Sequence, residues 1–324
     1  MKQVIKNIVT GIVVAAFIVV GFISGVKLDA LQIETIKTLC IICGCSVLFC
    51  FVVGEISRNN SQMDKLWSIL PIAYAWVVAG KGGMGIRLVL MAILITIWGI
   101  RLTYNFGKKG AYSIKFWTGE EDYRWPILRK TKPFTNKFVW ALFDLIFISG
   151  YQNILVLIIC FPMVACMSST AALGVMDIVA VVLTLACIVY ETIADAQQME
   201  FQTIKWAMIK QGKKLEELPY PYNKGFNTKG LWALSRHPNY LAEQSTWVCI
   251  YLFTIAAGVT TWGIFNWTIV GCMLLILLFM GSSTFGEKIS SGKYLEYKEY
   301  QEKVSKFIPL PNDYESQEYH AKTI

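Results

Sequence analysis

The chain has 324 residues, of which 55% are hydrophobic and only 16% are charged, and its formal net charge is +8. The apolar share is above that of typical soluble domains, so the composition excludes an ordinary water-soluble globular protein. The basic residues lie in short clusters between apolar runs and do not form a stripe interleaved with aromatic residues, so we expect no nucleic-acid partner.

Apolar runs long enough to cross a bilayer recur along the chain. A helical span needs about 20 such residues, and in lipid every backbone group must be paired within the run. We predict an all-α fold, a polytopic transmembrane helical bundle of about eight spans, with seven possible because the third is short and contains Pro71. The predicted spans lie near residues 8–26, 36–54, 67–80, 86–105, 138–162, 171–191, 240–258 and 262–281.

The basic residues predict the orientation in the membrane. Residues 101–137 hold nine Lys and Arg, residues 192–239 hold seven, and the tail after Met280 holds six, whereas the connections near 163–170 and 258–263 hold none. By the positive-inside rule the basic regions face the cytoplasm, and an even number of spans then places both termini there. The sequence is consistent with a bacterial inner membrane.

Polar residues share one face where the sixth predicted span ends. Glu191, Asp195, Gln198 and Gln202 follow one another at helical spacing. Ionisable groups in membrane helices are functional candidates by default, so this stripe predicts one wall of a polar cavity. The alternative is a helix end that meets water.

The fourth span ends in "WGIRLTYNF", where Trp98, Arg101 and Asn105 share a face. Arg101 alone would only mark the cytoplasmic end of the helix. Asn105 and the following "GEEDYRW" add polar and aromatic groups. Two interpretations therefore stay open, a helix end at the cytoplasmic surface and part of a polar functional site.

The stretch "SRHPNYLAEQSTW" at residues 235–247 carries the densest polar chemistry. Pro238 suits a first helical turn, and a helix N-terminus attracts anions. Arg236 can bind phosphate through bidentate hydrogen bonds, and His237 can add a further hydrogen-bond donor. Asn239 and Glu243 share a face that continues into the membrane, where a carboxylate accepts hydrogen bonds from ribose hydroxyls. The stretch therefore predicts a nucleotide cofactor site, and the alternative is a charged helix cap at the membrane interface.

After the last span, Glu287 and Tyr294 lie in a tail of alternating charges, which is either an amphipathic surface helix or a flap over the same cavity. The spacing in "CIICGC" looks like a metal motif, but it lies inside an apolar span with no His or Asp nearby, so we predict no metal site.

Taken together, "WGIRLTYN", "EEDYRW", "YETIADAQQMEF", "KGLWALSRHPNYLAEQSTW" and "GEKISSGKYLEYKEYQEKVSKFIP" resemble the steroid 5-alpha-reductase C-terminal superfamily, in its uncharacterised bacterial branch. These matches run in order from about residue 98 to 309. The "RHPNY" element is shared with sterol reductases and with isoprenylcysteine-type membrane methyltransferases. In the methyltransferases a later Glu-Glu pair follows, where this chain has "GEK".

The resemblance implies a cytoplasm-facing cavity that holds NADPH, or S-adenosylmethionine in the methyltransferases. The residues it assigns to cofactor binding are Arg101, Asn105, Asp195, Arg236, His237, Asn239, Tyr240, Glu243, Glu287 and Tyr294. It also points to Asp64, in "NNSQMDKLWSILP", as the catalytic acid. The tyrosine that accompanies this acid in the reductases has no match at the expected spacing, and Tyr104 is the nearest candidate.

Three functions are consistent with this pattern. The first is NADPH-dependent reduction of a carbon–carbon double bond in an enone or a sterol- or isoprenoid-like lipid, with an acid that supplies the proton. The second is S-adenosylmethionine-dependent methylation of a lipid, and the third is a non-catalytic lipid-binding membrane protein. We predict N-terminal helices over 1–85, a reductase-like domain over 86–310 and a polar tail over 311–324. The expected partners are a lipid-like substrate and membrane lipids, with no obligate protein partner.

Overall fold

The computed structural model describes residues 27–261 and 263–314. Over these residues the chain is helical and contains no β-strand, which confirms the predicted all-α class. The chain divides into two compact units. Unit 1 comprises Met1–Thr184 and Trp247–Leu277, and unit 2 comprises Leu185–Thr246 and Leu278–Ile324. The span predicted at 8–26 lies outside the described residues, and the division predicted at residues 85 and 310 stays a prediction.

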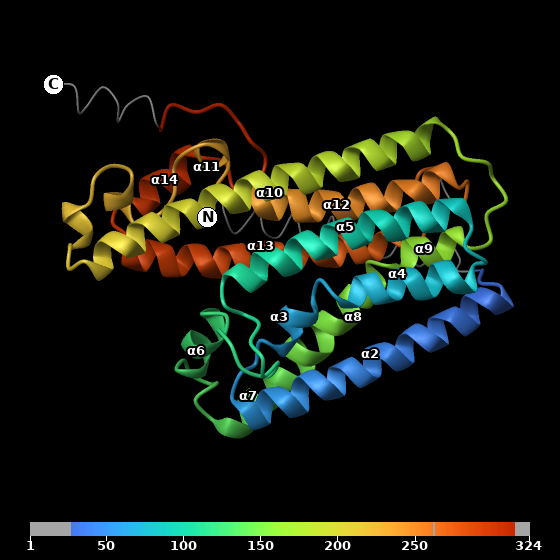
Figure 1. Cartoon of the computed structure of the whole chain (residues 1–324), viewed down its shortest axis with the longest axis horizontal. Coiled ribbons are helices and arrows are strands. Elements are labelled where there is room, and N and C mark those ends of the chain that lie inside the picture. The colour runs from blue at the N-terminus through green and yellow to red at the C-terminus, as the bar shows by residue number, and fades with distance from the viewer. Residues whose placement is uncertain (1–26, 262, 315–324) are drawn as a thin grey trace. The chain divides into compact units, whose positions relative to one another are not determined.

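Short helices alternate with long ones along the described chain (Figure 1). In order they are α2 (Ala30–Ser57), α3 (Gln62–Leu66), α4 (Leu70–Lys81), α5 (Ile86–Lys108), α6 (Arg124–Arg129), α7 (Lys137–Phe143), the π-helix η1 (Asp144–Tyr151), α8 (Gln152–Ile158), α9 (Phe161–Cys166), α10 (Val175–Lys210), the 3-10 turns η2 (Leu215–Glu217) and η3 (Tyr222–Lys224), α11 (Leu231–Leu234), α12 (Pro238–Ala256), α13 (Ile269–Lys293) and α14 (Tyr297–Lys303). Each unit contains part of α10, α12 and α13.

Five helical stretches among the described residues are long and apolar enough to cross a bilayer, so the protein is an integral membrane protein. They are α2, α5, the run Lys137–Cys166, α10 and α13. They correspond to five of the eight predicted spans. The predicted span 67–80 forms α4, whose 12 residues rise only about 18 Å, against a hydrocarbon core of about 30 Å. The number eight and the cytoplasmic placement of the termini stay predictions.

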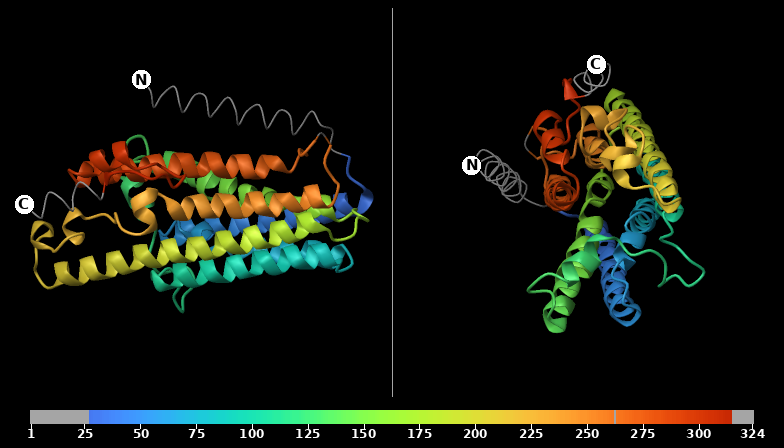
Figure 2. Two further views of the ribbon diagram at one scale, coloured as in Figure 1. Left: turned by 90° about the horizontal axis from the view of Figure 1, so that it is seen from above. Right: turned by 90° about the vertical axis from the view of Figure 1, so that its left-hand side faces the viewer.

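In unit 1, α2 packs against η1 and α8, and α4 forms a hairpin with α5. Figure 2 shows α2, in blue, side by side with the green segment that contains α7 and η1. The Asp29 carboxylate caps α2 by accepting a hydrogen bond from the Gln32 backbone N–H at 2.8 Å. Gly99 lets α5 approach the start of α4, because a Cβ at this position would lie 2.5 Å from the Ser68 carbonyl oxygen.

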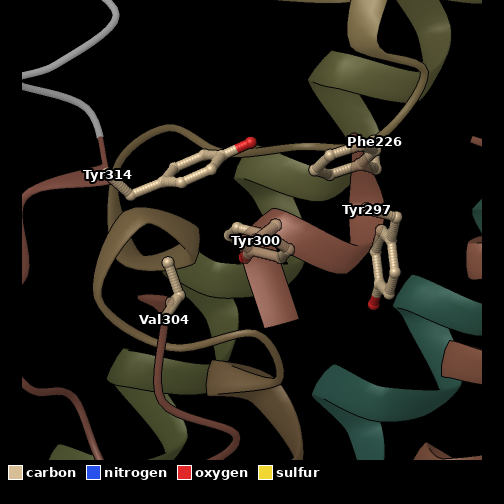
Figure 3. Packing of buried hydrophobic residues seen from close by; sticks show 5 residues of the cluster. All are labelled: Phe226, Tyr297, Tyr300, Val304 and Tyr314. Atoms are coloured by element: carbon tan, nitrogen blue, oxygen red, sulfur yellow. The ribbon is translucent and has the colours of Figure 1, made fainter. Parts of the chain in front are cut away.

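In unit 2, an aromatic cluster holds α14 in place. Figure 3 shows its residues Phe226, Tyr297, Tyr300, Val304 and Tyr314. The Phe226 and Tyr297 rings pack edge to face with centroids 4.8 Å apart, and the Tyr300 hydroxyl donates to the Trp232 carbonyl oxygen. The cluster fixes the polypeptide between residues 297 and 304 in unit 2.

Candidate functional site

Arg236, His237 and Glu287 form a buried ionic cluster in unit 2. One Glu287 carboxylate oxygen, Oε1, accepts from Arg236 Nε at 2.7 Å and lies 2.9 Å from His237 Nε2. The other oxygen, Oε2, accepts from Gln301 Nε2 at 3.0 Å. Side-chain exposure is 10% for Arg236 and 7% for Glu287, so water screens the pair weakly. The Glu287 carboxylate is thus bonded within the protein to Arg236 and His237, which begin the predicted cofactor stretch.

The segment around α14 completes this cluster. Arg236 Nη1 donates to the Gln301 carbonyl at 2.8 Å and also to the Val304 carbonyl. The backbone N–H of Arg236 donates to the Ser305 carbonyl at 2.9 Å, and that of His237 to the Lys306 carbonyl at 3.1 Å. Two of the guanidinium nitrogens are therefore engaged inside the protein, and Arg236 clamps the C-terminal segment.

The surroundings of His237 favour its neutral imidazole form. Burial lowers its pKa, because it disfavours the charged form, and the nearby positive charge of Arg236 acts in the same direction. The hydrogen bond to Glu287 opposes this shift. The His237 ring also stacks on Tyr240, with centroids 5.2 Å apart and planes 17° apart. A neutral His237 that donates from Nε2 satisfies Glu287 without adding a second cation.

The stripe predicted on α10 meets the predicted face of α12. The Asn239 amide donates from Nδ2 to Asp195 Oδ1 at 3.1 Å. Glu191 and Glu243 are each only 3% exposed, and Asp195 is 8% exposed. Buried carboxylates need bonding partners, so this polar face of α10 is packed within unit 2 and is not a helix end that simply meets water.

Several buried polar side-chain atoms of unit 2 have no hydrogen-bond partner among the residues that the structure describes. They include Tyr190 Oη, Gln198 Oε1, Asn223 Oδ1, Thr228 Oγ1 and Asn239 Oδ1. An unsatisfied buried polar atom costs about 1–3 kcal/mol, so native proteins hold few of them. Such atoms call for polar groups that bond to them.

Two of these atoms belong to α10, and the others belong to segments that contact α10. Asn227 donates from Nδ2 to the Gln197 carbonyl at 3.4 Å, which places the loop that contains Thr228 on the helix. The Tyr222 ring, next to Asn223, stacks on Phe201 with centroids 5.3 Å apart. Loop, 3-10 turn and α12 therefore all contact α10 between residues 195 and 201.

Tyr294 packs into the fold. Its ring lies against Gly225, where a Cβ would come within 2.2 Å of the ring, and Gly225 has a φ of +83° that favours glycine. The Lys205 ammonium lies 5.8 Å from the ring centroid and donates to the Gly225 carbonyl at 2.8 Å. The contacts assign Tyr294 to the packing of this loop on α10.

Asp64 lies on α3 in unit 1, at the centre of a second polar cluster. Trp125 Nε1 donates to Asp64 Oδ2 at 3.0 Å. Burial raises the Asp64 pKa, and the negative charge of Asp122 raises it further, while Arg124 opposes the shift. Arg124 forms two bonds to the Asp122 carboxylate, at 2.7 and 2.9 Å. A carboxyl with a raised pKa is suited to donate a proton, as expected for a general acid.

Tyr112, which contacts the residue next to Asp64, was not identified from the sequence. The Tyr112 hydroxyl donates to the carbonyl of Lys65, the residue after Asp64, at 2.8 Å. The Lys65 ammonium donates to the carbonyls of Phe116 and Thr118 at 2.8 and 2.7 Å, which ties the loop of Tyr112 to α3. Nothing in the spacing of the sequence connects residue 112 with residue 64.

The three candidates on α5, which are Arg101, Tyr104 and Asn105, belong to unit 1, and the remaining cofactor candidates belong to unit 2. Tyr104 is 63% exposed, and the Lys108 ammonium lies 4.5 Å from its ring centroid. Arg101 and Asn105 are partly buried. Within the described part of unit 1, no hydrogen bond joins Tyr104 to Asp64, so the predicted catalytic pair is not formed by direct contact.

Fold and composition define a helical integral membrane protein. A family model described as "Protein of unknown function (DUF1295)" matches residues 50–304, and the chain belongs to this family, which is steroid 5-alpha-reductase-like. An uncharacterised protein of Schizosaccharomyces pombe is 34% identical over 279 residues, which cover 81% of this chain and 78% of the relative. No solved structure matches the chain significantly. The relative is fungal, so the bacterial branch and the bacterial inner membrane stay predictions.

Proposed function

We propose that the protein is a membrane reductase that uses NADPH to reduce a carbon–carbon double bond in an apolar, lipid-like substrate. The proposal rests on one observation above all, the set of unpartnered buried polar atoms around α10. A nucleotide carries the amide, amino and hydroxyl groups that such atoms bind, and NADPH supplies the hydride when it is bound.

Several polar side chains of unit 2 have a role in this proposal. Asn239 and Gln198 offer carbonyl oxygens that would accept from an amide or amino group, and Thr228 and Tyr190 offer hydroxyls. Asp195 and Glu243 would accept from ribose hydroxyls. Arg236 and His237 would act indirectly, because their bonds to Glu287 hold the start of α12 in place. Arg101 and Asn105 stay predicted cofactor contacts.

Asp64 is the proposed proton donor. Its pKa is raised by burial and by Asp122, so its carboxyl holds a proton at a higher pH than a free aspartic acid. Trp125 orients the carboxyl through Oδ2. Tyr112 takes the place of Tyr104 as the proposed phenol near this acid, because its hydroxyl bonds to the adjacent residue on α3.

The bonds of Glu287 favour the reductase over the methyltransferase. In the methyltransferase hypothesis Glu287 or Glu243 pairs with the ammonium of S-adenosylmethionine. Both carboxylate oxygens of Glu287 already accept hydrogen bonds from the protein's own side chains. Glu243 alone would have to perform that role.

Two adjacent glutamines provide the test. Gln198 has an unpartnered buried oxygen, whereas Gln197 accepts from the Leu231 backbone N–H at 2.9 Å. Gln198→Leu should weaken NADPH binding at least tenfold, the equivalent of about 1.4 kcal/mol, and should leave the apo protein as stable as wild type or more so. Gln197→Leu should lower stability and change affinity less. Equal NADPH affinity in Gln198→Leu and wild type would contradict the proposed cofactor site.

A further inference from the structure

Unit 1 contains an apolar groove between α2 and the helical run from η1 to α9. Its cavity volume is about 520 Å³, and its lining consists of aliphatic, aromatic, glycine and cysteine side chains. On α2 it extends from Cys40 to Phe51, and on the opposite wall from Leu145 to Phe161. At 1.5 Å per residue, the α2 wall is about 16 Å long. A cavity of this length with few hydrogen-bonding groups suits an extended hydrocarbon chain.

Small residues on α2 form the floor of the groove. A Cβ built on Gly44 would meet no atom within 4 Å, so the backbone of α2 is directly accessible there. Leu48 lines the groove and is itself 63% exposed. Ile41, on the same helix, is 67% exposed. Since α2 is one of the candidate spans, the groove opens toward bilayer hydrocarbon and not toward water.

Positive charges flank one end of the groove. The Phe51 end lies beside the start of η1, because a Cβ on Gly54 would be 3.5 Å from the Asp144 carboxylate. Arg58 caps the C-terminus of α2, seven residues or about 10 Å beyond Phe51, and is exposed. Lys137, also exposed, begins α7 eight residues before Leu145. Basic side chains next to a membrane span attract anionic lipid headgroups.

We propose that this groove binds one acyl chain of an anionic membrane phospholipid, with the phosphate beside Arg58 and Lys137. The chain lies along α2 over Gly44, where only hydrocarbon is compatible with the lining. The phosphate meets the two cations at the end where α2 and the η1 segment converge. This site does not depend on the proposed reductase activity, because it uses none of the residues assigned to cofactor or proton transfer.

Photocrosslinking of the full-length protein in bilayers tests the site. The probe is phosphatidylglycerol with a diazirine in one acyl chain, and the readout is the peptide that carries the label. Label is expected within residues 40–51 and 145–161. Gly44→Phe should fill the groove and reduce this labelling about tenfold. Gly281→Phe is the matched control, because a Cβ on Gly281, in α13, also meets nothing within 4 Å.

Two further variants separate the parts of the proposal. Cys40→Phe narrows the groove at an exposed position, and it serves if Gly44→Phe does not fold. The double variant Arg58→Ala/Lys137→Ala should abolish the preference for the phosphatidylglycerol probe over the matching phosphatidylcholine probe.

Three outcomes would overturn the proposal. One is equal labelling in Gly44→Phe and wild type. Another is equal labelling of the wild type by the two probes. The third is that protein, and not lipid, covers the groove. This would be shown if labelling occurs only after residues 1–26 are deleted, or if the wild type forms a dimer that Gly44→Phe does not form.

Discussion

Removal of the Glu287 side chain should destabilise unit 2 strongly. Glu287→Ala takes away the acceptor for Arg236, His237 and Gln301 at once. It leaves a guanidinium that is only 10% exposed without its counter-ion. Breaking a buried pair in this way costs about 3–5 kcal/mol, because the remaining charge stays desolvated. We therefore expect the free energy of unfolding to fall by about this amount.

Glu287→Gln refines the expectation. The amide keeps one acceptor oxygen of the same shape but loses the charge, so about half of the loss should remain, in line with about 1.5–3 kcal/mol for a hydrogen bond to a charged group. The assay is reversible denaturant unfolding of the detergent-purified protein. Glu299→Ala is the control, because Glu299 is 55% exposed and pairs with Lys303 on the surface, where about 0–1 kcal/mol is usual. If Glu287→Ala loses no more stability than Glu299→Ala, the reasoning about the cluster is wrong.

Three further predictions concern buried charge. Because the pKa of Asp64 is raised, its contribution to stability is present below its ordinary pKa near 3.8 and is lost as pH rises through the raised pKa. Asp64→Asn should therefore be at least as stable as wild type at pH 7 and should lose that advantage in acid. Unfolding measured at several pH values tests this. The lowered pKa of His237 has the opposite sign: stability is present above its ordinary value of 6.5 and lost as pH falls through the lowered pKa, and His237→Gln should flatten this acid limb. Arg87 and Asp177 form a buried ion pair at 2.7 Å, with side-chain exposures of 7% and 3%. Arg87→Leu should lower the free energy of unfolding by about 3–5 kcal/mol, and the double variant Arg87→Leu/Asp177→Leu should lower it much less. Additive losses in the double-mutant cycle would count against the pair.

The helices could be predicted well from the sequence, because the bilayer demands long apolar runs. Five predicted spans correspond to the five helical stretches of the described residues that are long and apolar enough to cross a bilayer. The run at 67–80 is short already in the sequence, and it forms the 12-residue α4, which Gly82 and Gly83 follow. Apolar composition alone does not make a helix long enough to span the membrane.

Only those features of the candidate site that follow from helical spacing could be predicted from the sequence. Periodicity placed Asp195 and Asn239 each on the polar face of its own helix, and the structure joins the two by a hydrogen bond of 3.1 Å. Arg236 was predicted to hold phosphate, but in the fold its Nε bonds Glu287 on α13 and its Nη1 bonds the Gln301 carbonyl on α14. These contacts join residues far apart in sequence, and no local pattern encodes them. The same holds for Tyr112, whose loop returns to α3 through backbone carbonyls.

The most direct test of the central claim is ligand-induced stabilisation of the wild-type protein. The purified protein would be unfolded thermally with NADPH, with NADH and with S-adenosylmethionine, each over a concentration series. A ligand at 100 times its dissociation constant stabilises the fold by about 2.7 kcal/mol. The account predicts a concentration-dependent upward shift of the unfolding temperature with NADPH and none with S-adenosylmethionine. A shift with S-adenosylmethionine alone, or with none of the three, would contradict it.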